Sequence, residues 1–145
     1  MNERFVLITG ASRGLGKILS WRFAKEGYGL CLVAQEEKRL NELSIELKQQ
    51  FKNEIRFISC DLGNSMDIDV LINKTRQKLP RLDVLINNAA IQGAIGPLWE
   101  NDLDSWKNVI NVNLMGPMAL CRAFVPWMEA NAGGAIINLS GGGAT

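Results

Sequence analysis

Five short apolar runs, separated by stretches with helical spacing, constrain the fold of this chain more than any other feature. The runs cover residues 5–8, 30–34, 55–60, 84–86 and 135–139. Each run is predominantly apolar over a length typical of strands, which is the pattern of parallel strands buried on both faces. The sequence therefore predicts an α/β protein.

The stretches between the runs carry the spacing of amphipathic helices. We expect helices that begin near Leu15, Leu40, Met66 and Asp102. Their apolar residues recur at intervals of three and four, so that one face of each helix is apolar. The last helix runs to about Met128, and Gly116, Pro117 and Pro126 are expected to bend it.

Strands that alternate with helices favour right-handed crossovers and one parallel sheet. The expected fold is a Rossmann-type, doubly wound parallel sheet of five strands with flanking helices, in one domain over residues 1–145. In such a sheet, ligands bind at the carboxyl ends of the strands.

Composition excludes several classes of function. The net charge is +1 and no long basic run occurs, so a nucleic-acid partner is not expected. The first residues lack the apolar core of a signal peptide, and no run reaches the ~20 apolar residues that span a membrane, so we expect a cytoplasmic protein without a membrane partner. There is no histidine, and Cys31, Cys60 and Cys121 are far apart, so we expect no metal site and three buried, reduced thiols.

A glycine-rich turn follows the first predicted strand and opens the first helix. Residues 9–16 read Thr-Gly-Ala-Ser-Arg-Gly-Leu-Gly. Gly10 permits a tight exit from the strand, Gly14 lets a pyrophosphate approach the backbone, and Gly16 lets helix and strand pack closely. The helix N-terminus adds unpaired N–H donors and a partial positive charge, so the turn predicts a dinucleotide site.

The Gly-x-x-x-Gly-x-Gly spacing of this turn resembles that of the short-chain dehydrogenase/reductase family. Further similarities follow in order: Asp61-Leu62 after the third strand, Asn-Asn-Ala-Ala at residues 87–90, Asn113 in the long helix, and residues 134–140 leading to a serine. The resemblance implies cofactor contacts from Gly10, Ser12, Arg13, Gly14, Leu15, Gly16, Gln35, Asp61, Leu62, Asn88 and Ala89. It implies catalytic roles for Asn113 and Ser140. Taken singly, Asp61 could form a turn, Asn87 and Asn88 could cap a strand, and Asn113 could be an ordinary helix residue.

The choice of cofactor depends on the end of the second strand. An acidic residue there would accept hydrogen bonds from the ribose hydroxyls of NAD, whereas a cation would bind the 2′-phosphate of NADP. The strand ends at Ala34 and Gln35, without a carboxylate, and Arg13 resembles the family's cationic contact to that phosphate. We expect NADP, with NAD possible; Lys38 and Arg39 are nearby and are equally typical of a solvated helix face.

The resemblance implies an NAD(P)-dependent oxidoreductase that transfers hydride between NADP(H) and a small alcohol or carbonyl substrate. The family's Tyr-x-x-x-Lys pair is not found, because Leu32 follows the single tyrosine, Tyr28, at that spacing. We therefore expect the chain to be the cofactor-binding half, truncated after the fifth strand. Ser140 is followed by Gly141 where many relatives have the catalytic serine, which leaves its role open. The alternatives are a non-catalytic NAD(P)-binding or regulatory protein and an inactive fragment.

Two segments predict contacts with other molecules. The helix over residues 102–130 is apolar around much of its circumference, so we expect a homo-oligomer through it. The glycine-rich, apolar segment 91–99 is compatible with one wall of a substrate cleft and equally with an ordinary connecting loop.

Overall fold

The five predicted strands form one parallel sheet in the computed structural model, which describes residues 4–141. In chain order the strands are β1 (Phe5–Thr9), β2 (Gly29–Ala34), β3 (Ile55–Ser59), β4 (Val84–Asn87) and β5 (Ala135–Asn138). Their order across the sheet is β3-β2-β1-β4-β5, and every neighbouring pair is parallel. The predicted Rossmann-type architecture is confirmed.

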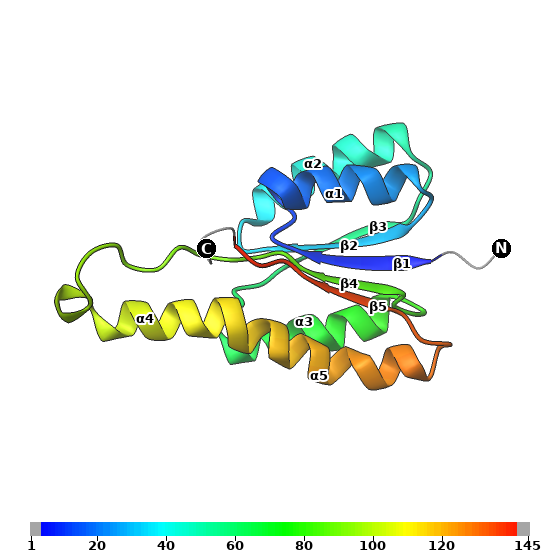
Figure 1. Ribbon diagram of the computed structural model, residues 1–145. Helices are drawn as coiled ribbons and strands as arrows, with labels where there is room; N and C mark the ends of the chain where they lie inside the picture. Colours follow the sequence, from blue (N-terminus) through cyan, green and yellow to red (C-terminus); the bar gives the residue numbers. More distant parts are fainter. Residues whose placement is uncertain (1–3, 142–145) are drawn as a thin grey trace.

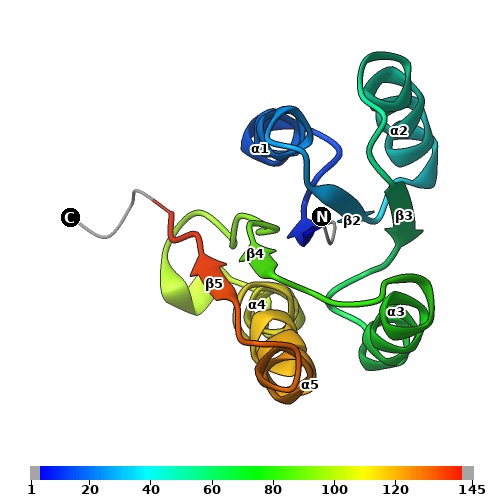
Figure 2. The ribbon, with the colours of Figure 1, turned by 90° about the vertical axis from the view of Figure 1, so that its right-hand side faces the viewer.

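Helices cover both faces of the sheet (Figures 1 and 2). On one face lie α1 (Gly14–Lys25) and α2 (Glu37–Gln50). On the other lie α3 (Ser65–Lys78) and α5 (Gly116–Glu129), and α4 (Leu103–Ile110), which has no buried residue, extends beyond the carboxyl ends of the strands. Because strand side chains alternate in direction, Val6 and Ile8 enter the core under α1 and α2, and Leu7 enters the core against α3 and α5.

Burial falls from the centre of the sheet to its edges. Every residue of β1 is buried, since β1 has a strand on each side and helices on each face. At the two edges, β3 is only partly buried, and β5 has no buried residue. The apolar run 135–139 therefore forms a strand as predicted, but most of its surface is open within the described part of the chain.

The crossovers leave β1 and β4 in opposite directions. From β1 the chain passes over one face to β2, whereas β4 pairs with β1 on the other side. The carboxyl ends of β1 and β4 consequently lie at the point where the strand order reverses, which is where open α/β sheets form a crevice.

The long predicted helix is one continuous helical stretch with a local irregularity. Asp102 caps it, because the Asp102 carboxylate accepts a hydrogen bond of 2.9 Å from the backbone N–H of Ser105. A π-helical turn, η2 (Asn111–Met115), joins α4 to α5 and ends where Gly116 begins. This irregularity lies next to Gly116 and Pro117, where the sequence predicts a bend; α5 then continues as a helix through Pro126, which is exposed, so the carbonyl that loses its amide partner can bond to water.

Two other details differ from the sequence-based expectations. Cys31 and Cys60 are buried, but Cys121 is only partly so.

By length and composition, Leu103–Glu129 is also apolar enough to cross a membrane, with a mean hydropathy of 1.2 in its most apolar window. A core helix of a globular protein meets the same criterion, and Leu120, Phe124 and Met128 are buried against the sheet and α3.

Candidate functional site

The glycine turn between β1 and α1 has the backbone that its spacing predicts. Gly10 and Gly14 adopt positive φ angles of 65° and 52°. A Cβ on Gly16 would overlap the carbonyl oxygen of Gly10, and a Cβ on Gly10 would lie 2.9 Å from the Cα of Ala89. A Cβ on Gly14, in contrast, would meet nothing. Gly10 and Gly16 thus permit internal packing, whereas Gly14 keeps open space above the turn.

The N-terminus of α1 has no side-chain cap. Arg13 occupies the capping position without a capping bond, and the first turn contains no acidic residue. Asn64 caps α3 and Asp102 caps α4 with a side chain, whereas α2, like α1, has no side-chain cap but carries Glu37 in its first turn. The first N–H groups of α1 therefore remain available to an anion, which the helix dipole also attracts.

Thr9 joins the ends of β1 and β4. Its side chain is buried and accepts hydrogen bonds of 3.0 Å from the backbone N–H groups of Asn88 and Ala89. In return, the Asn88 amide donates to the carbonyl oxygens of Thr9 and Gly10, at 2.9 and 3.2 Å. Sequence reasoning did not single out Thr9; a hydroxyl residue ending an otherwise apolar buried strand was the available signal.

A cleft of about 380 Å³ opens at the carboxyl ends of the strands. All the predicted cofactor residues line it except Gly16, which lies beneath the turn. The sequence analysis did not name the remaining lining residues as cofactor contacts, although Ile91 begins the segment 91–99 that it made compatible with a cleft wall; they are Val33, Ala34, Glu36, Cys60, Ala90, Ile91 and Val112. Most of them follow the ends of β2, β3 and β4, so the topology brings them to the cleft together with the predicted residues.

Two side chains of the cleft, Asp61 and Cys60, interact closely with their surroundings. One carboxylate oxygen of Asp61 accepts a hydrogen bond of 2.8 Å from the N–H of Gly63, which fixes the turn after β3. Burial, together with the charges of Asp67 and Asp61, raises the pKa of the Cys60 thiol to about 12. Cys60 is therefore protonated at neutral pH and is no nucleophile.

Asn113 lies inside the π-helical turn and faces the loop after β4. Its side-chain oxygen accepts a hydrogen bond from the N–H of Ile91, and its amide donates to the carbonyl oxygen of Ile91, both at 2.9 Å. Asn113 does not line the cleft, whereas Ile91 does. In this geometry Asn113 acts as a positioning residue that holds one wall of the cleft.

The predicted serine stands apart from the cleft. Ser140 is exposed just beyond β5 and does not line the cleft. The strand before it is tied to β4, because the Asn87 amide donates to the side-chain oxygen of Asn138 at 2.7 Å. Residues 142–145 lie outside the described residues.

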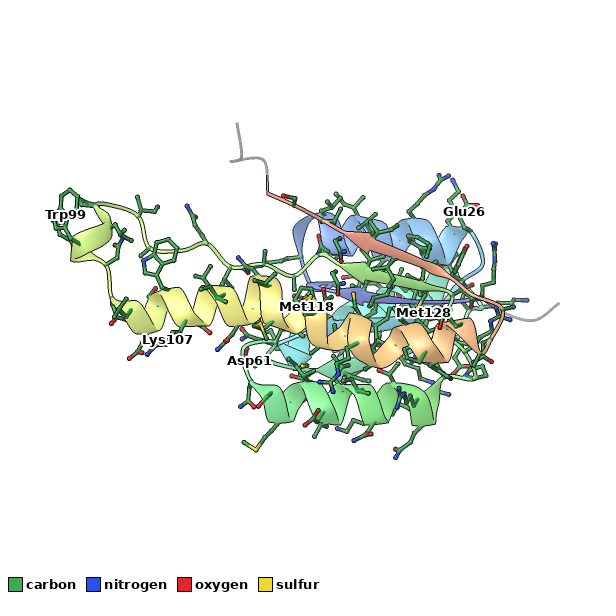
Figure 3. All side chains as sticks on the ribbon, turned by 60° about the horizontal axis from the view of Figure 1, so that its bottom comes forward. Glu26, Asp61, Trp99, Lys107, Met118 and Met128 are labelled. Carbon is green, nitrogen blue, oxygen red and sulfur yellow. The ribbon has the colours of Figure 1, made fainter. Side chains whose placement is uncertain are left out.

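The segment 91–99 separates into two parts. Ile91 belongs to the cleft, but the chain then projects away from the sheet, and Trp99 lies at the far end of this projection, 85% exposed (Figure 3). Within residues 4–141, no group of cysteine, aspartate and glutamate side chains is arranged to hold a metal ion.

Comparison with known proteins agrees with this geometry. A sequence model of the short chain dehydrogenase family matches residues 4–144. The chain belongs to that family. A 3beta-hydroxysteroid dehydrogenase of Mediterraneibacter gnavus is 34% identical over 96% of the chain, and sulfoacetaldehyde reductase 2 of Chromohalobacter salexigens is 33% identical over 92%. The alignments cover 50% and 53% of these relatives, so the chain spans about half of their length.

Solved structures of family members superpose closely. A metagenomic short-chain oxidoreductase in complex with NADP gives a TM-score of 0.89 at 34% identity, covering 94% of this chain and 62% of that structure. L-sorbose reductase from Gluconobacter frateurii, complexed with NADPH and L-sorbose, gives 0.87 at 31% identity, covering 94% and 51%. The shared part is the Rossmann-type sheet described above.

Proposed function

We propose that this chain binds NADP(H) and forms the cofactor-binding half of an oxidoreductase that interconverts an alcohol and a carbonyl compound. The observation that carries the proposal is the uncapped N-terminus of α1, open above Gly14, at the edge of the cleft. Family members crystallised with NADP and NADPH support the choice of ligand.

The residues present fit a dinucleotide. The N–H groups at Gly14 and Leu15 would hold the diphosphate, and Asp61 with Leu62 would flank the adenine. Asn88 and Ala89, fixed by Thr9, would contact the cofactor beyond the diphosphate. When bound, the nicotinamide supplies or accepts the hydride.

The charges in the part of the cleft beside the end of β2, where the adenosine ribose would lie, favour NADP over NAD. Arg13 and Gln35 line the cleft, and no carboxylate stands at the end of β2. Glu36 also lines the cleft, but it is paired with Arg39 at 2.9 Å, which offsets its repulsion of a phosphate. Arg13, which makes no ion pair within the described residues, is thus free to bind the 2′-phosphate.

Proton transfer needs a group that residues 4–141 do not place at the cleft. Tyr28 stands before β2, at the opposite end of the sheet, where Arg4 covers its ring at 4.3 Å. This observation favours a second candidate, an NADP(H)-binding protein without turnover. The oxidoreductase assignment follows from family membership and requires proton-transfer residues outside the described part.

Titration with NADPH, followed by nicotinamide fluorescence, tests the proposal. We expect saturable binding with a dissociation constant in the micromolar range or below, weaker for NADH. No binding of either nucleotide would leave only the inactive-fragment alternative. Binding with no turnover of any alcohol, ketone or aldehyde by a chain that includes the Tyr-x-x-x-Lys pair would favour the binding protein.

We also propose that the chain forms a homo-oligomer through α4 and α5. The outward face of these helices carries Ile110, Leu114, Met118 and Val125, all exposed. A contiguous apolar surface of this kind is typical of an interface.

A further inference from the structure

The free edge of β3 is a second surface with unused binding capacity. Hydrogen bonds from Leu30 N–H to the Glu54 carbonyl and from Cys60 N–H to the Ala34 carbonyl mark the two ends of the β2–β3 pair. Backbone groups alternate in direction along a strand, so Arg56 and Ile58 also face β2. The N–H and C=O groups of Ile55, Phe57 and Ser59 therefore point outward, where residues 4–141 provide no further strand.

This edge is the floor of a groove between two helices. Lys48 and Glu37 of α2 border it on one face of the sheet, and Lys74 and Lys78 of α3 border it on the other. The groove encloses about 420 Å³, and the half-buried ring of Phe57 contributes to its lining. It is separate from the cofactor cleft, and the two share no lining residue.

The groove is positively charged. Its cations are Arg56 and the three lysines, and Glu37 is the one acidic residue in the lining. Arg56 is paired with Glu54 at 2.7 Å, but none of Lys48, Lys74 and Lys78 forms an ion pair in the described structure. Three uncompensated lysines therefore surround a row of free backbone donors and acceptors.

We propose that this groove binds an acidic segment of another protein, which adds to β3 as an extended strand. The backbone of Ile55, Phe57 and Ser59 would supply the strand hydrogen bonds, and the lysines would pair with carboxylates on both faces of the added strand. A second copy of this chain is disfavoured, because pairing two β3 edges would bring these lysines close to each other. Five strand residues accommodate a partner segment of about 17 Å.

A labelled peptide of roughly seven residues, in the order Glu-Glu-Val-Val-Glu-Glu-Val so that carboxylates lie on both faces of the extended strand, tests the proposal by fluorescence anisotropy with the whole chain. We expect saturable binding that weakens as salt is added. Lys74→Glu should weaken it about fivefold or more, since a like charge then replaces an attractive one. Lys25→Glu, the same charge change at an exposed helix end outside the groove, should leave binding unchanged.

Backbone pairing is tested separately with the same peptide N-methylated at alternate residues, which removes the strand donors but keeps the charge. Binding by this peptide equal to that of the parent would overturn the proposal, because charge alone would then account for it. Equal affinity for a short single-stranded oligonucleotide, or an unchanged affinity of Lys74→Glu, would overturn it as well. Urea unfolding of each variant shows that the fold is retained, a control independent of NADPH binding.

Discussion

The side chain of Asn113 makes two hydrogen bonds of 2.9 Å with the backbone of a single residue, Ile91. Asn113 lies where the helix widens into a π turn, and Ile91 lies in the loop that leaves β4. The pair therefore connects the long helix to the wall of the cleft, across 22 residues of chain. An amide satisfies both the N–H and the C=O of Ile91, whereas a carboxylate in the same place has no donor for the C=O.

Replacing Asn113 should loosen the cleft wall. Asn113→Ala removes both bonds, and we expect the free energy of unfolding to fall by about 1 kcal/mol, since the pair is partly exposed to water. Asn113→Asp should lower the free energy of unfolding at least as much, because the carboxylate charge would face the carbonyl oxygen of Ile91. Urea unfolding measures the stability, and hydrogen exchange at the Ile91 amide measures the local effect. Unchanged exchange in Asn113→Ala would contradict the positioning role.

The glycines of the turn should respond differently to alanine. Gly16→Ala places a methyl group against the Gly10 carbonyl, so we expect a loss of about 2 kcal/mol or more in stability. Gly14→Ala meets no atoms and should cost only about 1 kcal/mol, from its positive φ. Its methyl group would, however, occupy the space proposed for the diphosphate. Urea unfolding and NADPH titration separate the effects; normal NADPH affinity in Gly14→Ala would refute the proposed diphosphate position.

Arg13 should distinguish the two nucleotides. Arg13→Ala removes the proposed cation at the 2′-phosphate, and we expect NADPH to bind about tenfold more weakly while NADH affinity changes little. Lys38→Ala is the matched control, because Lys38 is an exposed cation of α2 that does not line the cleft. If Arg13→Ala lowered the affinities for NADPH and NADH equally, Arg13 would not be the residue that binds the 2′-phosphate.

The fold was predictable because apolar runs report directly on burial. Residues 5–8 read as a strand buried on both faces, and β1 is buried throughout. The shape of the long helix was less predictable. Gly116, Pro117 and Pro126 predicted bends, and the observed irregularity lies directly before the first of them, at Asn111–Met115, where the turn brings Asn113 to Ile91. The contact between Asn113 and Ile91 is tertiary, so local helix propensity does not predict it.

The cleft was predictable in part, for a related reason. Residues such as Arg13 and Asp61 follow strand ends in a recognisable order, and the topology then places them together. Thr9 was not singled out, because it acts through its hydrogen bonds; Ile91 begins the segment that the sequence made compatible with a cleft wall, but its backbone contact with Asn113 was not predicted.

Stability should fall in alkaline solution because of a buried thiol. Burial raises the pKa of Cys31 from 9.0 to about 12. Between these values the unfolded chain loses this proton and the folded chain keeps it, so rising pH favours unfolding by about 1.4 kcal/mol per pH unit. Below about pH 9 the Cys31 thiol is protonated in both states, so it no longer makes stability depend on pH. Urea unfolding at several pH values should show a shallower alkaline decline in Cys31→Ala than in the unaltered chain; identical slopes would contradict the assignment.

The outward face of α4 and α5 should drive self-association. Val112, Leu120 and Phe124 are buried on the inner side of this helical stretch, whereas Leu114 and Met118, 57% and 59% exposed, lie on the outer side.

Sedimentation at micromolar concentration should therefore show species larger than a monomer, because contact between two such faces removes apolar surface from water. Met118→Glu should shift the chain to monomer, since a carboxylate buried between two copies would lose its hydration. Ile45→Glu is the control: Ile45 is 48% exposed on α2, on the opposite face of the sheet, and the same change there should leave association intact. A monomeric parent chain, or equal dissociation in both variants, would show that the α4–α5 face is not the interface.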